Sequence, residues 1–393
     1  MSARNRIRVD VAIVGGGIAG LWLLNLLRGR GYSALLIERR AFGDGQTIRS
    51  QGMIHGGLKY ALSGALNTAS EAVAAMPGRW RACLTGSGEI DLRGVRVASD
   101  RCHLWSPDES MLARLGGFLA SKALRGRVRR LDAREYPSPF DANGFDGAVY
   151  ELDELVLDVH SLLTRLAHAQ RGYTLQADVG NHQFVCGADG SIASLRLPHV
   201  EIDAARFVFA AGAGNEALSA RFGESAPLMQ RRPLRQVIVR REQLPALYGH
   251  CVPQLPKTEP RVTVTTHTDA NGARLWYLGG QFASDGATRS DDEQVSHARA
   301  ELAACLPWLD LSGAQLEPLY IDRAEPEQSG GRRPDEAYVA TVANALICWP
   351  TKLALAPDLG DKVVSQLAAP SISSSDADGG FTAPPIAVPP WHR

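Results

Sequence analysis

The chain of 393 residues has no excess charge of either sign and no long hydrophobic run. Its 42 Lys and Arg residues equal its 42 Asp and Glu residues, so the formal net charge is zero. This balance argues against binding to nucleic acid, or to an anionic membrane, over a broad surface. No apolar stretch reaches the roughly 18 residues that a membrane-spanning helix needs, so we expect no membrane span.

Cysteine is scarce as well. The six cysteines are isolated from one another, and none forms a CxxC pair. Such usage is typical of a reducing compartment, so we expect a cytoplasmic protein without a metal site. The N-terminal apolar run could pass for a signal peptide, but Asp10 and four glycines between Gly15 and Gly20 interrupt it. We interpret it as a strand and a turn.

A glycine-rich turn does stand out near the N-terminus. Residues 8–14 are a β-branched run that predicts a buried strand, and residues 33–38 predict a second one. Between them, residues 18–30 have the apolar spacing of a helix. The glycines fall between the first strand and the helix, which is the arrangement of a βαβ unit in a parallel sheet.

The spacing Gly15-x-Gly17-x-x-Gly20, with Glu38 at the end of the second strand, predicts a dinucleotide site. Gly15 permits a tight turn, Gly17 lets the backbone approach a pyrophosphate, and Gly20 lets the helix pack on the strand. N–H groups at the helix N-terminus bind phosphate, and Glu38 can accept hydrogen bonds from ribose hydroxyls. We place Arg39 in the same site. A glycine turn in another α/β domain is the alternative.

Three features favour FAD over NAD as the dinucleotide. The site lies at the start of the chain, and the loop 41–64 after the second strand is too long for a plain connection. A further predicted strand ends at Ala211 and Gly212, which would bring its backbone close to the same dinucleotide. We also place Val179, at the end of the predicted strand 174–179, among the cofactor contacts.

Four segments together carry a family resemblance: DVAIVGGGIAG with Glu38, SQGMIHGGLKY at 50–60, FVFAAG at 207–212 and WPTKL at 349–353. They resemble the FAD-dependent oxidoreductases of the D-amino-acid-oxidase and glycerol-3-phosphate-dehydrogenase superfamily. The second segment is most similar to the glycerol-3-phosphate and 2-hydroxyglutarate dehydrogenase branches. The resemblance implies oxidation of a C–H bond beside oxygen or nitrogen, by hydride transfer to flavin N5, with electrons passing to oxygen, a quinone or another acceptor.

The loop after the second strand supplies candidate contacts to the flavin ring. Gly52 lets the backbone run close to a flat ring, and Ser50 and Gln51 can bond its polar edge. Histidine is a residue type that titrates near neutrality, so His55 can act as a base or a hydrogen-bond donor. In some members of the superfamily a histidine of the corresponding loop carries the flavin covalently, and the resemblance extends that alternative to His55. A satisfied structural histidine is the other alternative.

The resemblance places Lys59 and Tyr60 against an anionic substrate. The related branches usually have arginine at the first position, and a lysine lacks its planar fork. Arg323, at the end of a predicted strand, could pair with a substrate carboxylate or phosphate. The neighbouring Asp322 could equally form a local ion pair with it.

The segment Pro350-Thr351-Lys352 is predicted to open the last helix. Proline suits the first helical position. A helix N-terminus aimed at the flavin would stabilise the negative charge of the reduced ring, and Lys352 would add a full charge. We assign Thr351, Lys352 and Leu353 to the cofactor site, although Trp349-Pro350 departs from the glycine-rich form of the related branches.

These segments predict an α/β fold. A Rossmann-like FAD-binding domain of the glutathione-reductase type accompanies a second, α+β substrate domain built on a mixed or antiparallel sheet. We assign residues 1–85, 150–226 and 335–369 to the first domain and residues 86–149 and 227–334 to the second. Residues 370–393, rich in Ser, Asp and Pro, are expected to form a flexible tail.

The expected function is FAD-dependent oxidation of a small anionic hydroxy acid, polyol phosphate or amino compound. His55, Lys59, Tyr60, Arg323 and Lys352 are the candidate catalytic residues. One alternative is an amine oxidase of the glycine- or sarcosine-oxidase kind. Another is a flavoprotein that acts on a peptide or protein partner.

Overall fold

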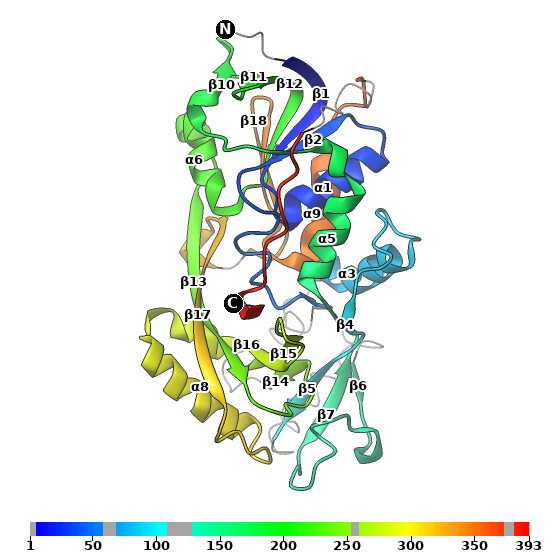
Figure 1. Cartoon of the computed structure of the whole chain (residues 1–393), viewed down its shortest axis with the longest axis vertical. Helices are drawn as coiled ribbons and strands as arrows, with labels where there is room; N and C mark the ends of the chain where they lie inside the picture. Colours follow the sequence, from blue (N-terminus) through cyan, green and yellow to red (C-terminus); the bar gives the residue numbers. More distant parts are fainter. Residues whose placement is uncertain are drawn as a thin grey trace.

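The computed structural model describes residues 5–57, 68–107, 128–252, 259–332, 334–372 and 381–392. Two large sheets organise them, one in the upper half of Figure 1 and one in the lower half. A small third sheet connects them. Its strands are β3 (Met53–Ile54), β8 (Leu155–Leu157) and β4 (Val97–Ser99).

The first sheet is built around β1 (Asn5–Val14), which runs parallel to β2 (Ala34–Glu38) on one side and to β12 (Val200–Phe209) on the other. The carboxyl ends of these three strands therefore meet at one edge, where ligands bind in such sheets. The sheet is completed by β9 (Thr174–Gln176), β10 (Phe184–Cys186), β11 (Ile192–Arg196), β18 (Tyr338–Val342) and β19 (Ala345–Trp349).

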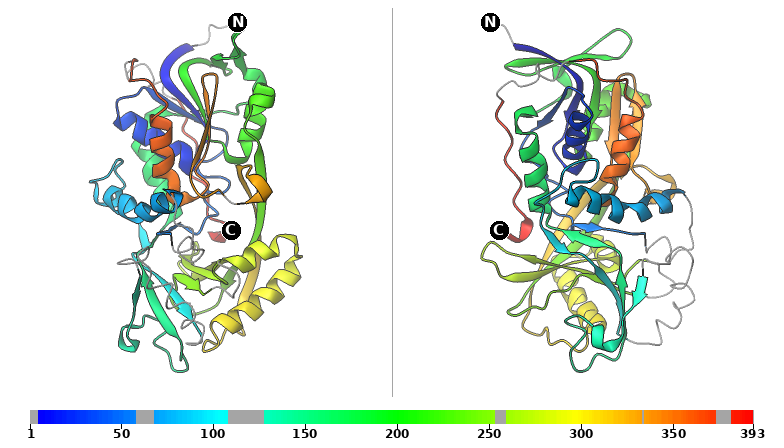
Figure 2. Two further views of the ribbon diagram at one scale, coloured as in Figure 1. Left: turned by 180° about the vertical axis from the view of Figure 1, so that it is seen from behind. Right: turned by 90° about the vertical axis from the view of Figure 1, so that its right-hand side faces the viewer.

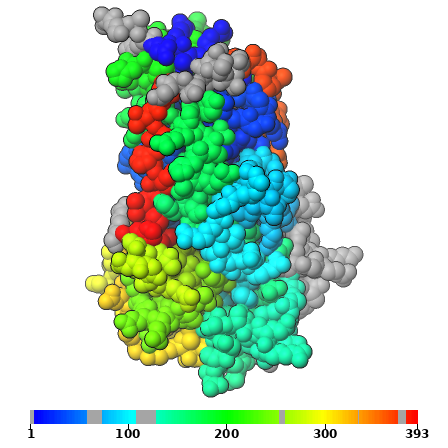
Figure 3. All heavy atoms as spheres, turned by 45° about the vertical axis from the view of Figure 1, so that its right-hand side comes forward, coloured from blue at the N-terminus to red at the C-terminus, as the bar shows by residue number. Residues whose placement is uncertain are grey.

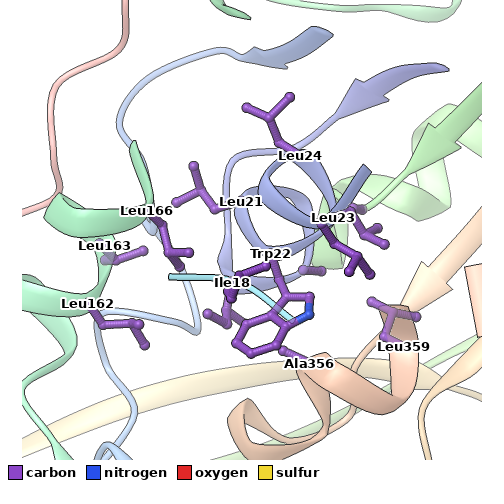
Figure 4. Close-up of a cluster of buried hydrophobic side chains, with 14 of the residues drawn as sticks. Ile18, Leu21, Trp22, Leu23, Leu24, Leu162, Leu163, Leu166, Ala356 and Leu359 are labelled. Carbon is purple, nitrogen blue, oxygen red and sulfur yellow. The ribbon is translucent and has the colours of Figure 1, made fainter. Parts of the chain in front are cut away.

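Helices α1 (Ile18–Gly29), α5 (Val159–Ala169) and α9 (Ala356–Val364) pack together beside this sheet. Figure 4 shows the indole of Trp22 lying between the leucines of α5 and the start of α9. Trp22 also meets Trp80 of α3 (Thr68–Thr85), with ring centroids 4.8 Å apart. Burial of these large apolar side chains fixes α1, and with it the glycine turn that precedes α1.

The second sheet is mixed, because β14 and β5 pair in parallel while all other adjacent strands of this sheet pair antiparallel. In order, its strands are β17 (Gln315–Pro326), β13 (Met229–Arg240), β16 (Arg274–Gly279), β15 (Thr263–Thr268), β14 (Gly249–Cys251), β5 (Cys102–Ser106), β7 (Ala148–Leu152) and β6 (Val128–Arg130). Helix α8 (Asp291–Cys305) packs against β13 and β17, at the far end of the molecule from the N-terminus (Figure 2). The expected α/β class and mixed second sheet are confirmed.

The last helix differs from the prediction. It does not begin at Pro350: a single 3-10 turn covers Leu353–Leu355, and α9 follows from Ala356. Before it, Thr351 has φ of +59°, and the N–H of Lys352 donates to the carbonyl of Pro350 at 2.6 Å. That conformation is uncommon for a β-branched residue. The prediction used the preference for proline in the first turn of a helix. Pro357, seven positions after Pro350, is the proline that occupies the first turn of α9.

The end of the chain also differs from the expected flexible tail. Residues 381–392, called the C-terminal strap below, run along one face from the first sheet to the second, in red in Figure 3. The N–H of Phe42 donates to the carbonyl of Pro385 at 2.8 Å, and the N–H of Ala387 donates back to Phe42 at 3.0 Å. On the second sheet, Trp391 stacks on His267 with centroids 4.1 Å apart. These contacts give the strap a fixed course that its composition did not indicate.

No helix within the described ranges is both long and apolar enough to span a bilayer. All six cysteines lie in those ranges, and each is a free thiol.

The anchor of the strap yields a stability prediction. Trp391 is buried against Tyr277 and His267, so Trp391→Ala is expected to lower the free energy of unfolding by about 3 kcal/mol. Val388→Ala is the matched control, because Val388 lies in the same strap and is 55% exposed. Urea unfolding measures both. A change below about 0.5 kcal/mol for Trp391→Ala, the usual size of a surface effect, would show that the strap is not anchored there.

The buried His267 ring predicts a dependence of stability on pH. Burial lowers the pKa of His267 to about 4, so the folded protein resists a protonation that the unfolded chain accepts below about 6.5. Stability from this group is therefore complete above pH 6.5 and declines as the pH falls towards 4. We expect His267→Gln to reduce the loss of unfolding free energy between pH 7 and pH 5 by about 2 kcal/mol. Equal pH slopes in the two proteins would contradict this.

Candidate functional site

A cavity of about 840 Å³ lies between the two sheets, at the carboxyl ends of β1, β2 and β12. The loop from Gly43 to Gly57 lines it from the first sheet, and parts of β13, β16 and β17 line it from the second. Its size is within the range of ligand sites. The sequence-predicted residues found in its lining are Gly15, Gly17, Glu38, Arg39, Ser50, Gln51, Gly52, His55, Val179, Ala211, Gly212, Arg323, Thr351, Lys352 and Leu353.

Among the described residues, Gly20 is the one predicted site residue that does not line the cavity. Gly20 packs behind the turn, where an added Cβ would lie 1.9 Å from the carbonyl oxygen of Gly15. Its role is therefore the close helix packing that the motif predicts. Lys59 and Tyr60 fall outside the described residues, so their placement against a substrate stays a prediction.

The turn after β1 leaves room for a ligand only because it is made of glycine. Gly15 has φ of +113°, and a Cβ there would lie 2.6 Å from the backbone of Ala210 and Ala211 at the end of β12. Gly212, which follows Ala211, has φ of +58° and also lines the cavity. Two backbone segments, from β1 and from β12, thus reach the cavity without side chains in between.

Side chains hold this turn in place. One carboxylate oxygen of Glu38 accepts from the N–H of Gly16 at 2.8 Å, and the other accepts from the N–H of Arg40 at 2.9 Å. The hydroxyl of Thr47 accepts from the N–H of Ile18 at 3.1 Å. Each carboxylate oxygen has a second lone pair, so Glu38 retains the capacity to accept from ribose hydroxyls as well.

The loop also contributes a buried hydroxyl whose lack of a partner among the described residues indicates a ligand. The Oγ of Ser50 is buried and has no hydrogen-bond partner among the residues that the structure describes, and Ser50 lines the cavity. A buried polar group without a partner costs roughly 1–3 kcal/mol, so a ligand that bonds it is favoured. Together with the glycine turn, this hydroxyl makes the cavity fit a dinucleotide that extends from Glu38 towards Ser50.

Two neighbouring loop residues, Gln51 and Gly52, also make close contacts within the protein. The amide of Gln51, which lines the cavity, donates to the carbonyl of Tyr277 at 2.9 Å, and this bond joins the loop to β16. Gly52 has φ of +74°, and a Cβ there would lie 2.1 Å from the carbonyl oxygen of Leu157. Gly52 is therefore required by the approach to β8, whether or not a ring lies beside it.

His55 belongs to a cluster of three side chains. Its Nδ1 lies 3.5 Å from Oε2 of Glu154, and Nε2 of His250 lies 3.4 Å from the same oxygen. Glu154 and His250 are buried, whereas the His55 side chain keeps 39% of its exposure at the cavity. Two imidazoles and a carboxylate are also a possible metal-ligand set, with all ligand atoms within 4.8 Å of one another.

The charges in this cluster shift its protonation. Burial lowers the pKa of His55, hydrogen bonding to Glu154 opposes that shift, and electrostatic interactions with His250 and Lys352 reinforce it. Burial alone would raise the pKa of Glu154, but hydrogen bonds from His250 and His55 outweigh it and hold that pKa well below its usual range. At neutral pH the cluster therefore contains an ionised carboxylate and an unprotonated His55.

The remaining predicted cations, Lys352 and Arg323, also belong to the lining. Lys352 follows the turn at Thr351, close enough to His55 to influence its pKa. Arg323 lies within β17 rather than at its end, and its Nε–H donates to the carbonyl of Arg232 at 3.0 Å. Asp322 pairs with Arg231 at 2.6 Å, so the local ion pair considered for Asp322 is made with a residue of β13.

Sequence reasoning missed Glu154 and His250. His250 lies in a three-residue strand, β14, and nothing in its neighbours indicates a site. Glu154 carried a weak signal, because it is an acid between the apolar ends of two strands, β7 and β8. Such an acid is buried only when it is paired, and its partners come from distant parts of the chain.

Comparison with known proteins agrees with this geometry. A family model described as FAD dependent oxidoreductase matches residues 10–341. A probable FAD-dependent oxidoreductase of Pseudomonas aeruginosa is 48% identical over 389 residues, which are 98% of this chain and 98% of that protein. Its crystal structure has a TM-score of 0.84 at 41% identity, over 99% of each chain.

More distant structures share the fold. Glycine oxidase from Geobacillus kaustophilus has a TM-score of 0.65 at 18% identity, covering 93% of this chain and 96% of its own. Dithionite-reduced L-α-glycerophosphate oxidase from Mycoplasma pneumoniae, with FAD bound, has the same TM-score at 14% identity, covering 93% and 97%. At these identities the likeness concerns the fold.

The glycine turn generates a test of cofactor binding. Gly15→Ala places a methyl group against the backbone of Ala210, so we expect the purified protein to lose most of its bound FAD. Gly29→Ala is the matched control at the other end of α1, where an added Cβ meets nothing within 4 Å. The ratio of flavin absorbance to protein absorbance measures both.

A second variant guards against a folding defect in the first. A Cβ at Gly17 meets only the flexible hydroxyl of Thr47, at 3.2 Å, so Gly17→Val should fold while its side chain fills part of the cavity. Full flavin content in a folded Gly15→Ala or Gly17→Val protein would contradict the placement of the dinucleotide at this turn.

Proposed function

The chain belongs to the FAD-dependent oxidoreductase family, and from that premise we propose that it oxidises a small anionic hydroxy compound. The observation that carries the proposal is the place of His55 in the cavity that the glycine turn opens, with its Nδ1 3.5 Å from the buried carboxylate of Glu154. A hydroxy acid and a polyol phosphate are the two substrate classes that fit this description.

The bound FAD supplies the acceptor for the hydride that leaves the substrate carbon. In this chain, the backbone of Gly15 and Gly17 would leave space for the diphosphate, and Glu38 would accept from the ribose with Arg39 in the same part of the lining. Ser50 offers its hydroxyl to the part of the cofactor that reaches the loop, where Val179, Ala211, Gly212, Thr351 and Leu353 complete the lining. Residues of the first sheet would thus bind the nucleotide, and those of the second would face the substrate.

A hydroxyl substrate favours the presence of a base more strongly than an amine does. An alcohol is about as weak an acid as water, with a pKa near 16, whereas an alkylammonium group loses its proton near pH 10. A neutral His55 can take the hydroxyl proton at the moment the hydride leaves carbon, which avoids a high-energy protonated product. This is why we place hydroxy compounds before amines.

The size and charge of the substrate follow from the walls of the cavity. Because the same space of about 840 Å³ also receives FAD, the room left for the substrate is small. Lys352 and Arg323 lie in the lining and would attract a carboxylate or phosphate.

The free thiols at all six cysteines support a reducing location, such as the cytoplasm.

Anaerobic bleaching of the flavin tests the proposal. The holoenzyme is mixed with hydroxy acids, polyol phosphates and amino acids in parallel, and the loss of flavin absorbance is followed. We expect bleaching by a hydroxy acid or a polyol phosphate. His55→Asn should slow it by roughly 10²- to 10⁴-fold, the range for loss of a general base, without loss of FAD.

The matched control is His199→Asn, which changes an exposed histidine at the turn before β12 and should bleach at the normal rate. Because protonated His55 cannot accept a proton, the rate should rise with pH through the lowered pKa of this group. Bleaching by amino acids alone, or a His55→Asn protein as fast as the parent, would overturn the proposal.

A further inference from the structure

We propose that Glu154 and His250 are positioning residues that act through His55. The carboxylate of Glu154 fixes which ring nitrogen of His55 faces the cavity and balances the charge when that ring takes up a proton. His250 shares the same carboxylate oxygen and so limits how firmly the proton is held. This inference rests on the proposed role of His55 as a base.

Glu154 is held rigidly at the turn between β7 and β8. Its Oε1 accepts from the N–H of Gly56 at 2.9 Å, in the same loop segment as His55, and the residue is only 3% exposed. With one oxygen held by that backbone group, the other is directed at the two rings. A carboxylate bound in this way cannot rotate to solvent, so it holds a constant position relative to His55.

The contact with Glu154 selects the tautomer of His55. Nδ1 faces a carboxylate oxygen, which accepts hydrogen bonds only, so the ring hydrogen of neutral His55 belongs on Nδ1. The lone pair is then on Nε2, the nitrogen left to face the cavity. A base must present an unprotonated nitrogen to its substrate, and this arrangement provides one before the substrate arrives.

His250 competes for the same oxygen. Its Nε2 lies 3.4 Å from Oε2 of Glu154, and its Nδ1 lies 2.8 Å from the hydroxyl of Thr263. While His250 donates to Glu154, that oxygen interacts less strongly with a protonated His55. The ring can then release the proton again after each turnover, which an undivided buried ion pair would hinder.

The other ionisable groups around the cluster have the following interactions. Lys352 faces His55 from the segment after β19 and disfavours its protonation. Asp153 precedes Glu154 but pairs with Arg81 and Arg101, and the Cys102 thiol nearby is kept neutral because burial raises its pKa. Lys59 and Tyr60 follow His55 in sequence and lie outside the described residues.

The chemistry balances around this cluster. As the substrate carbinol becomes a carbonyl, its carbon loses a hydride to the oxidant and its oxygen loses a proton to Nε2 of His55. The resulting imidazolium lies beside the ionised Glu154, so the site remains neutral at that pair. The proton leaves to solvent once the product has gone.

Histidine-ring NMR of protein labelled with ¹⁵N at histidine tests the inference without any substrate. In the parent holoenzyme we expect the Nδ1–H tautomer for His55. Glu154→Gln removes the charge that favours the imidazolium, so the pKa of His55 should fall by about one unit or more. His250→Asn leaves the carboxylate to His55 alone, so the same pKa should rise.

Glu151→Gln is the matched control, because Glu151 is a carboxylate of β7 that pairs with Arg129 and does not contact the cluster. It should leave the His55 signal unchanged, and the ring of His297 on α8 serves as an internal reference. The acid limb of the flavin-bleaching rate, measured with the fastest hydroxy compound of the panel, should move in the same directions as the NMR pKa values.

Three results would overturn the inference: an Nε2–H tautomer in the parent, shifts of the same sign in the two variants, or a stoichiometric metal ion held by the three side chains. If the Glu154→Gln protein does not fold, the inference is still tested by the tautomer of His55 in the parent and by the His55 pKa in the His250→Asn protein. Failure of every hydroxy compound to bleach the flavin would instead reject the proposed function, and the opposed shifts of the His55 pKa would still be measurable.

Discussion

The contact between the glycine turn and the end of β12 brings together the two backbone segments that open the cavity at the first sheet. A side chain at residue 15 would overlap the backbone of Ala210 and Ala211, so the two segments approach this closely only with glycine. The same turn is bonded to Glu38 of β2 and to Thr47 of the following loop. The ends of β1, β2 and β12 and the following loop are therefore fixed relative to one another by one close backbone approach and two backbone-to-side-chain hydrogen bonds.

The second sheet reaches the site through that loop. Tyr277 of β16 donates its hydroxyl to the carbonyl of Arg49 at 3.0 Å and also meets the amide of Gln236 at 2.9 Å, while Gln51 bonds back to β16. Because these bonds are buried, breaking one leaves a polar group unsatisfied, and the loop is held between both sheets. His55 lies a few residues further along, so its distance from Glu154 and His250 depends on the same bonds.

The local parts of this arrangement could be predicted from sequence. The unit from β1 to β2 is contiguous, and apolar periodicity together with the glycine spacing determines it. The cluster around His55 could not be predicted, because Glu154 lies in the turn between β7 and β8 and His250 lies in β14, and only the folded chain brings them together. The start of the last helix was predicted wrongly at Pro350 because proline is common both in turns and at helix starts. The ordered course of the strap was not predicted because its proline-rich composition resembles that of disordered segments.

The strap also has a consequence for how the molecule matures. Phe42 and Ile386 form an isolated bridge, and a Cβ on Gly16 would touch the Phe42 ring at 2.7 Å, so the strap supports the residue that lies behind the nucleotide turn. The two partners are separated by most of the polypeptide. During translation the early loop therefore lacks its outer support until residues 385–387 have been synthesised, and the nucleotide pocket acquires its final form only after that point.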